Sequence, residues 1–218
     1  MELVEPKSRP GTWIFGYGSL IWRPDFEYDR KETALLRGYG RYFWQGSWSS
    51  RGTKEQPGRV ATITEEEDAE VWGVAFRVSR KAMEKTKTRL AKRETGYDLM
   101  RCDVSTLSGE VICAEVYIAR QRNEQYMGPT RTLQHTANDI LQARGKSGSC
   151  VDYLIGLVTA LRHHVPANRN PCDGHLVQLE GAVRWRLDTL ALHSDRLLTT
   201  SQVDVQKGKQ ELGVEAED

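Results

Sequence analysis

Apolar and polar residues alternate in two segments of the chain, and a period of two is typical of strands with one buried face. The apolar positions are Trp72, Val74, Phe76 and Val78 in the first segment and Ile112, Ala114, Val116 and Ile118 in the second. Shorter apolar runs between Gly, Pro, Asp and Ser turns predict further strands at residues 12–16, 40–45, 58–64 and 99–105.

Helical spacing of apolar residues begins after Ser79, which is a suitable N-cap for a helix that runs to about Arg93. The apolar stripe of this helix is thin. A second helix is predicted over residues 131–144, with Gly145 as its C-cap.

Ser149 and Asp152 have the spacing of a capping box, which predicts a third helix starting at this point. Its apolar residues fall on one face, at Leu154, Leu157, Val158 and Leu161. A last helix is predicted near residues 175–188. Strands that come first and helices that come mostly later favour an α+β fold, in which helices flank a barrel-like sheet.

The length of 218 residues suits one domain, which we expect to span residues 1–198. Residues 199–218 are polar, charged and free of aromatic side chains, and are predicted to be a disordered tail. The chain has 31 Lys and Arg residues against 30 Asp and Glu residues. This balance argues against a nucleic-acid-binding or membrane-surface protein.

A cytoplasmic protein is expected, because the chain has no run of 18 apolar residues and its N-terminus is polar and acidic. The four cysteines, at Cys102, Cys113, Cys150 and Cys172, show no CxxC spacing and are expected to be reduced. Cys172 and His175, with His163 and His164, match no common zinc pattern. No metal or other cofactor is therefore predicted.

The most informative segment is residues 13–22, where an apolar run leads into Gly16-Tyr17-Gly18-Ser19. The two glycines can adopt backbone angles that other residues avoid, and such a loop can present main-chain N–H groups to an anion. A dinucleotide-binding GxGxxG motif would need a glycine in place of Ile21 and a helix that Pro24 interrupts. An ordinary strand followed by a glycine turn remains the alternative.

Further motifs follow this loop in a fixed order. They are Phe43-Trp44-Gln45-Gly46-Ser47, Arg51-Gly52, Pro57-Gly58-Arg59-Val60, Val71-Trp72-Gly73-Val74-Ala75, Arg93-Glu94 with Gly96-Tyr97, Tyr126-Met127-Gly128-Pro129, and Gly145-Lys146-Ser147-Gly148 with Asp152-Tyr153-Leu154. In this order and spacing the chain resembles the ChaC-type γ-glutamylcyclotransferases over roughly residues 12–190. The resemblance implies a small β-barrel flanked by helices, and an activity on glutathione.

Such an enzyme makes the γ-glutamyl α-amine attack its own γ-carbonyl, which gives 5-oxoproline and releases Cys-Gly. The reaction needs a folded substrate, a bound α-carboxylate and a group that moves protons, which a single buried carboxylate can be. The resemblance implies that Glu94 is this general acid/base. Glu110 and Glu115 are the competing carboxylates, and we expect both to be structural.

The resemblance also implies that the loop from Phe15 to Leu20 binds the substrate. The loop residues are Phe15, Gly16, Tyr17, Gly18, Ser19 and Leu20. Main-chain N–H groups there would hold the α-carboxylate or meet the developing oxyanion. Tyr153 is a further substrate-binding candidate, and a core tyrosine with a bonded hydroxyl is its alternative.

The chain departs from the family pattern at Trp48-Ser49-Ser50, where relatives have Thr-Asp-His, and at Thr95 and Cys150. These changes leave the loop and the base intact but bear on recognition of the Cys-Gly half. The basic stretch from Arg80 to Arg93 is either a solvated helix face or a surface that attracts an anionic peptide.

The sequence therefore predicts a glutathione-degrading enzyme, with no prediction of its oligomeric state. One alternative is a cyclotransferase for other γ-glutamyl amino acids or amines. The other is a non-enzymatic module that binds an anion or a protein.

Overall fold

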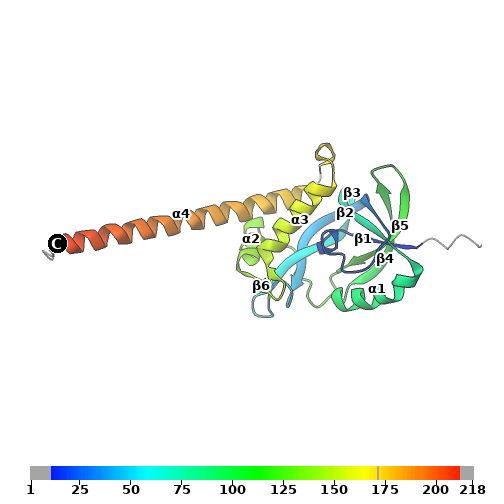
Figure 1. Cartoon of the computed structure of the whole chain (residues 1–218), viewed down its shortest axis with the longest axis horizontal. Helices are drawn as coiled ribbons and strands as arrows, with labels where there is room; N and C mark the ends of the chain where they lie inside the picture. Colours follow the sequence, from blue (N-terminus) through cyan, green and yellow to red (C-terminus); the bar gives the residue numbers. More distant parts are fainter. Residues whose placement is uncertain (1–10, 171, 212–218) are drawn as a thin grey trace, which may run out of the picture.

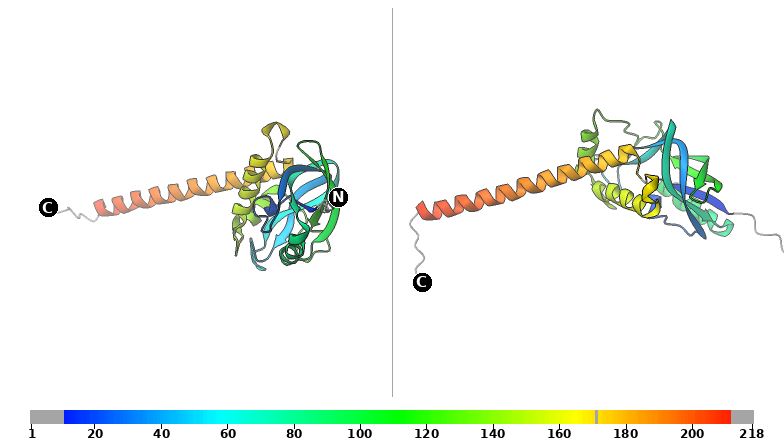
Figure 2. Two further views of the ribbon diagram at one scale, coloured as in Figure 1. Left: turned by 45° about the vertical axis from the view of Figure 1, so that its right-hand side comes forward. Right: turned by 90° about the horizontal axis from the view of Figure 1, so that it is seen from above.

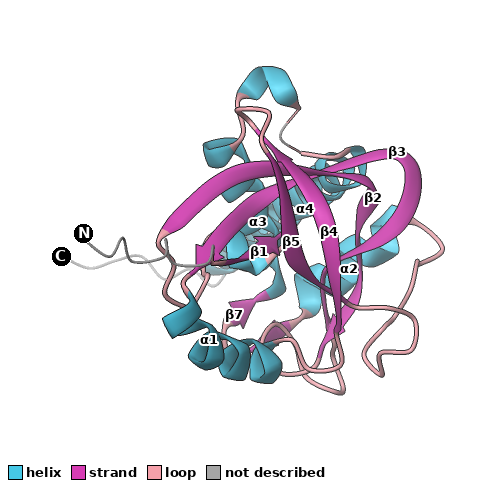
Figure 3. Cartoon of the chain, turned by 90° about the vertical axis from the view of Figure 1, so that its right-hand side faces the viewer, coloured by secondary structure: helices cyan, strands magenta, loops and turns pink. Residues whose placement is uncertain are grey.

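The fold is a closed barrel of five strands with helices packed around it (Figures 1 and 3). The computed structural model describes residues 11–170 and 172–211. The strands are β1 (Thr12–Gly16), β2 (Arg30–Ser47), β3 (Gly58–Val78), β4 (Asp98–Thr106) and β5 (Val111–Ile118). Their order is β1-β3-β2-β4-β5, and β1 closes the barrel by pairing antiparallel with β3 and parallel with β5. The α+β class and the mixed barrel are therefore confirmed.

The long strand β3 joins two segments that the sequence pattern had separated, residues 58–64 and the alternating segment that begins at Trp72. Residues 66–69, in the acidic stretch between them, bulge out of the ladder with β2. The register moves from the pair Tyr39 and Glu65 to the pair Arg37 and Glu70. An ion pair of 3.0 Å between these two side chains supports the pairing. The apolar period misses this part because exposed polar residues occupy it.

Helix α1 (Arg80–Arg93) begins at Ser79, whose side chain accepts a hydrogen bond from the Ala82 N–H. The predicted N-cap is thus confirmed. The helix lies along one side of the barrel (Figure 3). Only a narrow stripe of its side chains is buried. The buried members of this stripe are Met83, Thr86 and Leu90.

Helix α2 (Leu133–Gln142) is shorter than predicted, because its caps are Thr132 and Ala143. Gly145 is therefore not the C-cap, and the prediction was wrong at this point. The glycine instead belongs to a hairpin of two short strands, β6 (Arg144–Gly145) and β7 (Gly148–Ser149). A Cβ atom at Gly145 would lie 2.4 Å from the main-chain oxygen of Ser49, so close packing requires this glycine.

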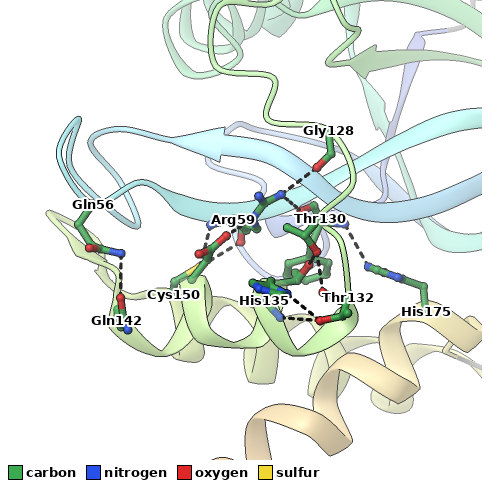
Figure 4. Close-up of polar contacts among 12 residues, drawn as sticks. Gln56, Arg59, Gly128, Thr130, Thr132, His135, Gln142, Cys150 and His175 are labelled. Atoms are coloured by element: carbon green, nitrogen blue, oxygen red, sulfur yellow. Dashed lines mark hydrogen bonds and ion pairs between the residues drawn. The ribbon is translucent and has the colours of Figure 1, made fainter.

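Helix α3 (Cys150–His164) begins with the predicted capping box, and both of its hydrogen bonds are present. The predicted inward residues, Leu154, Leu157, Val158 and Leu161, are all buried. Polar contacts also hold α3 and the segment before α2 on the barrel, as Figure 4 shows. The Cys150 thiol donates to the Arg59 carbonyl oxygen at 3.0 Å, and Arg59 Nη1 donates to the Gly128 oxygen at 2.9 Å.

Helix α4 (Gly174–Glu211) packs on α2 and α3 only through its first turns and then extends away from the barrel (Figures 1 and 2). Leu176, Leu179 and Val183 are fully buried, whereas Trp185 and Leu192 are more than 60% exposed. Residues 199–211 are helical, in contrast to the disorder predicted for them, and residues 212–218 lie outside the described residues. A polar composition does not prevent an established helix from continuing, since each added residue gains a main-chain hydrogen bond.

Two short 3-10 turns complete the described chain, η1 (Ser19–Ile21) and η2 (Ala167–Arg169). None of the helices in the described ranges has a stretch both long and apolar enough to cross a membrane.

Candidate active site

A cavity of about 440 Å³ lies between the loop after β1, the end of α1 and the segment that follows β2. Its walls include every residue that the sequence predicted for the site. These residues are Phe15, Gly16, Tyr17, Gly18, Ser19, Leu20, Glu94 and Tyr153. The structure thus brings together side chains that are far apart in the chain.

The two glycines of the loop lie where a larger residue would clash. Neither has a positive φ, and Gly18, with a φ of −123° and a ψ of −136°, lies in neither the α nor the β region. A Cβ atom at Gly16 would lie 2.6 Å from Leu20 Cβ, and one at Gly18 would lie 2.9 Å from the Tyr153 hydroxyl oxygen.

Glu94 is the C-cap residue of α1, where its N–H donates to the Leu90 carbonyl oxygen at 2.7 Å. Its side chain is only 14% exposed. Burial raises the pKa of Glu94, and the nearby Arg93 opposes this shift, with 3.4 Å between Arg93 Nε and Glu94 Oε1. A carboxyl group with a raised pKa is suited to both accepting and returning a proton.

Arg93 connects this carboxylate to the loop after β1. Its Nη2 donates to the Ser19 hydroxyl oxygen at 2.8 Å, and its Nη1 donates to the Arg23 carbonyl oxygen at 2.7 Å. The sequence interpretation had counted Arg93 within a basic helix face and missed this role. The Arg93-Glu94 pair in the motif was the signal that could have revealed it.

Tyr17 and Tyr153 are buried in the wall of the cavity. The Tyr17 hydroxyl donates to the Tyr117 carbonyl oxygen at 2.7 Å, whereas the Tyr153 hydroxyl accepts from the Ala61 N–H at 3.2 Å. The Tyr153 proton is not used in that bond. Burial raises the pKa of Tyr153 to about 12, so its hydroxyl is neutral at physiological pH and can donate.

Tyr97 also lines the cavity, although the sequence interpretation gave it no role. Burial raises the pKa of its hydroxyl well above the usual value, and the Tyr17 hydroxyl and the Glu94 carboxyl add to this shift. The turn before it contains Gly96 with a φ of +77°, a conformation that favours glycine.

The departure from the family pattern, Trp48-Ser49-Ser50, lies in the wall of the cavity and leads into Arg51. The β6–β7 hairpin holds this segment in place. The N–H groups of Lys146 and Ser147 donate to the carbonyl oxygens of Ser49 and Ser50 at 2.8 and 2.9 Å.

The competing carboxylates lie outside the cavity lining. Glu110 forms an exposed ion pair of 3.0 Å with Arg30, and the buried Glu115 lies 3.8 Å from Arg101. Within residues 11–170 and 172–211, no group of three His, Cys, Asp or Glu side chains is arranged to hold a metal ion. The ring of His175 instead accepts a hydrogen bond from the Phe43 N–H at 3.4 Å (Figure 4).

Of the basic stretch in α1, Lys92 and Arg93 reach the cavity. Arg89 donates to the Asp25 carbonyl oxygen at 2.8 Å, and Lys85 lies 3.4 Å from a Glu27 carboxylate oxygen. The helix therefore holds the segment after η1 in addition to presenting charge.

Several proteins are similar to this chain in sequence or in fold. The chain is 40% identical over 187 residues to glutathione-specific γ-glutamylcyclotransferase 1 of Danio rerio, covering 84% of this chain and 92% of that protein. It is 35% identical over 206 residues to the glutathione-specific γ-glutamylcyclotransferase of Schizosaccharomyces pombe, covering 86% and 98%. The crystal structure of a yeast γ-glutamyl cyclotransferase specific to glutathione superposes with a TM-score of 0.74 at 28% identity, covering 81% and 96%. The sequence profile of the ChaC-like proteins matches residues 12–186, and the chain belongs to this family.

Proposed function

We propose that this protein cleaves glutathione by γ-glutamyl cyclisation, with Glu94 as the general acid/base, and that it does so in the cytoplasm. One observation carries the assignment of the base. Glu94 is a mostly buried carboxyl group with a raised pKa, and it lines the same cavity as the Phe15–Leu20 loop. The names of the relatives from Danio rerio and Schizosaccharomyces pombe support glutathione as the substrate.

In the proposed reaction the α-nitrogen forms a bond with the γ-carbonyl carbon, and the bond from this carbon to the cysteine nitrogen breaks. The products are 5-oxoproline and Cys-Gly. The substrate ammonium starts with three protons and the lactam nitrogen keeps one. The other two end on the leaving nitrogen, which departs as an ammonium. Glu94 carries these protons one at a time, so no water, metal or nucleotide is consumed.

The loop from Phe15 to Leu20 is proposed to hold the α-carboxylate through its main-chain N–H groups, which fixes the folded conformer needed for attack. Tyr153 supports this role because its hydroxyl lies against Gly18 and retains a proton to donate. Arg93 fixes the position of Glu94 relative to the loop, because it contacts both. It thereby also limits how far burial raises the pKa of the base.

Two alternatives differ in what the cavity would need. A cyclotransferase for γ-glutamyl amines would need no cation beyond those near the α-carboxylate, whereas one for γ-glutamyl amino acids would need a second cation site, as one for glutathione does. A non-enzymatic anion-binding module would need no buried carboxyl. The cavity is lined by four basic residues, Arg23, Arg51, Lys92 and Arg93, and two acidic ones, Asp25 and Glu94. This excess of positive charge together with a carboxyl base favours a substrate with two carboxylates and one amine.

The proposal is tested by incubating purified protein with glutathione, without added metal or nucleotide, and measuring 5-oxoproline and Cys-Gly. Equal amounts of the two products are expected. A second arm uses γ-glutamyl amino acids and γ-glutamyl amines at the same concentration. Faster turnover of these compounds would identify them, and not glutathione, as the substrate. No product from glutathione or from these compounds would favour the binding module.

The cytoplasmic location is supported by the cysteines, since Cys102, Cys113, Cys150 and Cys172 are all free thiols in the structure. A reducing compartment keeps such thiols free. Cell fractionation with an antibody against the chain tests this location.

A further inference from the structure

Three arginines of the described chain are buried, and Arg51 differs from the other two in its lack of a counter-ion. Arg59 lies 2.6 Å from an Asp139 carboxylate oxygen, and Arg41 lies 3.3 Å from one of Asp173. Arg51 is 8% exposed and lines the cavity, yet no described carboxylate lies within 4.0 Å of its guanidinium. A buried charge without a partner is costly, which indicates that a ligand supplies the missing anion.

Asp152, an acid that interacts electrostatically with Arg51, is already engaged. Its Oδ2 accepts the Ser149 N–H at 3.1 Å in the capping box of α3. A Cβ atom at Gly148 would lie 3.1 Å from both this oxygen and Arg51 Nη1, so Gly148 separates the two groups. Asp152 therefore lowers the electrostatic cost of Arg51 without occupying its N–H groups.

The guanidinium is held in place before any ligand arrives. Nη1 donates to the Ser149 carbonyl oxygen at 3.0 Å, and the Arg51 N–H donates to the Ser47 hydroxyl oxygen at 3.0 Å. The guanidinium carbon lies 5.8 Å from the centre of the Tyr153 ring. Nε and Nη2 have no protein acceptor in the described chain, and these are the donors that can form a fork to a carboxylate.

Tyr153 also sets the position of Arg51 relative to the loop after β1. The hydroxyl end of Tyr153 lies beside Gly18, whereas its ring faces Arg51. Tyr153 thus contacts Arg51 through its ring and the loop through its hydroxyl end. Two anion-binding elements that contact different parts of one side chain match a ligand with a carboxylate at each end.

We infer that Arg51 binds the C-terminal glycine carboxylate of glutathione and thereby selects the tripeptide over simpler γ-glutamyl amides. This inference rests on the proposed function. It gives Arg51, together with the preceding Trp48–Ser50 segment in which the chain departs from its relatives, the role of recognising the Cys-Gly half. The loop from Phe15 to Leu20 keeps the α-carboxylate at the other end.

The test compares glutathione with its glycine ethyl ester, in which that carboxylate is masked. Wild-type protein should have a kcat/KM for glutathione on the order of 10- to 100-fold above that for the ester, as expected for a charge-assisted hydrogen bond. In Arg51→Met this ratio should fall towards one, and the loss should appear as a higher KM for glutathione. Arg51→Lys, which keeps the charge but not the fork, should lie between them.

Arg37→Met is the matched control, because Arg37 is exposed on β2 and does not line the cavity. It should retain the wild-type ratio. An unchanged ratio in Arg51→Met, or a wild-type protein that does not discriminate against the ester, would overturn the inference. The comparison of glutathione with its ester in wild type uses no variant, so it does not depend on whether Arg51→Met folds. A wild-type protein that releases no 5-oxoproline from either compound would instead contradict the proposed function.

Discussion

A glutamate at the end of a basic surface helix is normally solvated, and Glu94 is buried because the helix ends against the loop that follows β1. Arg93 points into this contact and binds Ser19 and Arg23 on the loop. The pKa of Glu94 is raised because its loss of water outweighs its attraction to Arg93. Burial thus raises the proton affinity of the proposed base, and the ion pair with Arg93 limits that rise.

Glu94→Gln should abolish turnover, because an amide of nearly the same shape can neither accept nor return a proton. The expected loss of kcat is about 100-fold or more, the contribution of a positioned general base. Steady-state assays of 5-oxoproline release measure it, with circular dichroism as a check of folding. A folded variant that keeps more than about a tenth of the wild-type kcat would exclude Glu94 as the sole base.

The raised pKa of Glu94 also predicts how stability depends on pH. The folded protein binds this proton more tightly than the unfolded chain, so the contribution is complete below the usual glutamate pKa and is lost as pH rises through the raised value. Above the raised pKa the charged Glu94 is therefore destabilising. Glu94→Gln should have a higher melting temperature than wild type near pH 7, and the difference should disappear near pH 4. A lower melting temperature for the variant at pH 7 would contradict this assignment.

At the scale of single residues, motifs predicted Glu94 as the base and the Phe15–Leu20 loop as a substrate-binding segment, but gave no role to Arg51 or Arg93. Their roles depend on contacts between distant segments, Arg51 with Ser149 and Arg93 with Ser19. The motifs include both arginines, but a single sequence does not show which segments they contact. The prediction for Gly18 rested on its backbone freedom, and the structure adds that the absence of a Cβ atom makes room for the Tyr153 hydroxyl.

At the scale of elements, the loop after β1 and helix α3 act together, because Gly18 lies directly against Tyr153. Gly18→Ala would introduce a Cβ atom 2.9 Å from the Tyr153 hydroxyl oxygen. The hydroxyl must then move away from the Ala61 N–H, at a cost of about 1–2 kcal/mol in the free energy of unfolding. Turnover should fall by about tenfold or more, since the same hydroxyl is proposed to bind substrate.

Gly181→Ala is the control for this substitution, because a Cβ atom there meets no atom within 4 Å. Gly181 lies within α4, where alanine is favoured over glycine by about 1 kcal/mol. This control should raise the melting temperature and leave turnover unchanged. If Gly18→Ala instead kept full turnover, the loop would be an ordinary strand and turn.

Most elements could be predicted because their signals are local. The capping box at Ser149 and the N-cap at Ser79 each depend on residues only a few positions apart. The full extent of β3 could not be predicted, because pairing with β2 resumes at Glu70 after residues 66–69 bulge out of the ladder. The end of α2 was misplaced because Gly145 serves the packing of a hairpin and not a helix terminus.

At the scale of the whole molecule, the barrel and its helices form one body, from which most of α4 extends (Figure 2). The anchor of α4 is complete by Val183, and its side chains beyond this point include exposed Trp185 and Leu190. We propose that residues 1–198 suffice for folding and activity. A chain that ends after residue 198 should match the full-length protein in melting temperature and in kcat/KM for glutathione. A loss of either would assign a role to residues 199–218.

The central claim is that this cavity cyclises the γ-glutamyl group of glutathione with a protein carboxyl as the only proton carrier. The most direct measurement is the release of 5-oxoproline from glutathione by purified wild-type protein and by Glu94→Gln, with a chelator present throughout. The account predicts one 5-oxoproline and one Cys-Gly for each glutathione consumed by wild type, and no turnover above background by a folded Glu94→Gln. Release of free glutamate in place of 5-oxoproline, or equal rates for the two proteins, would contradict it.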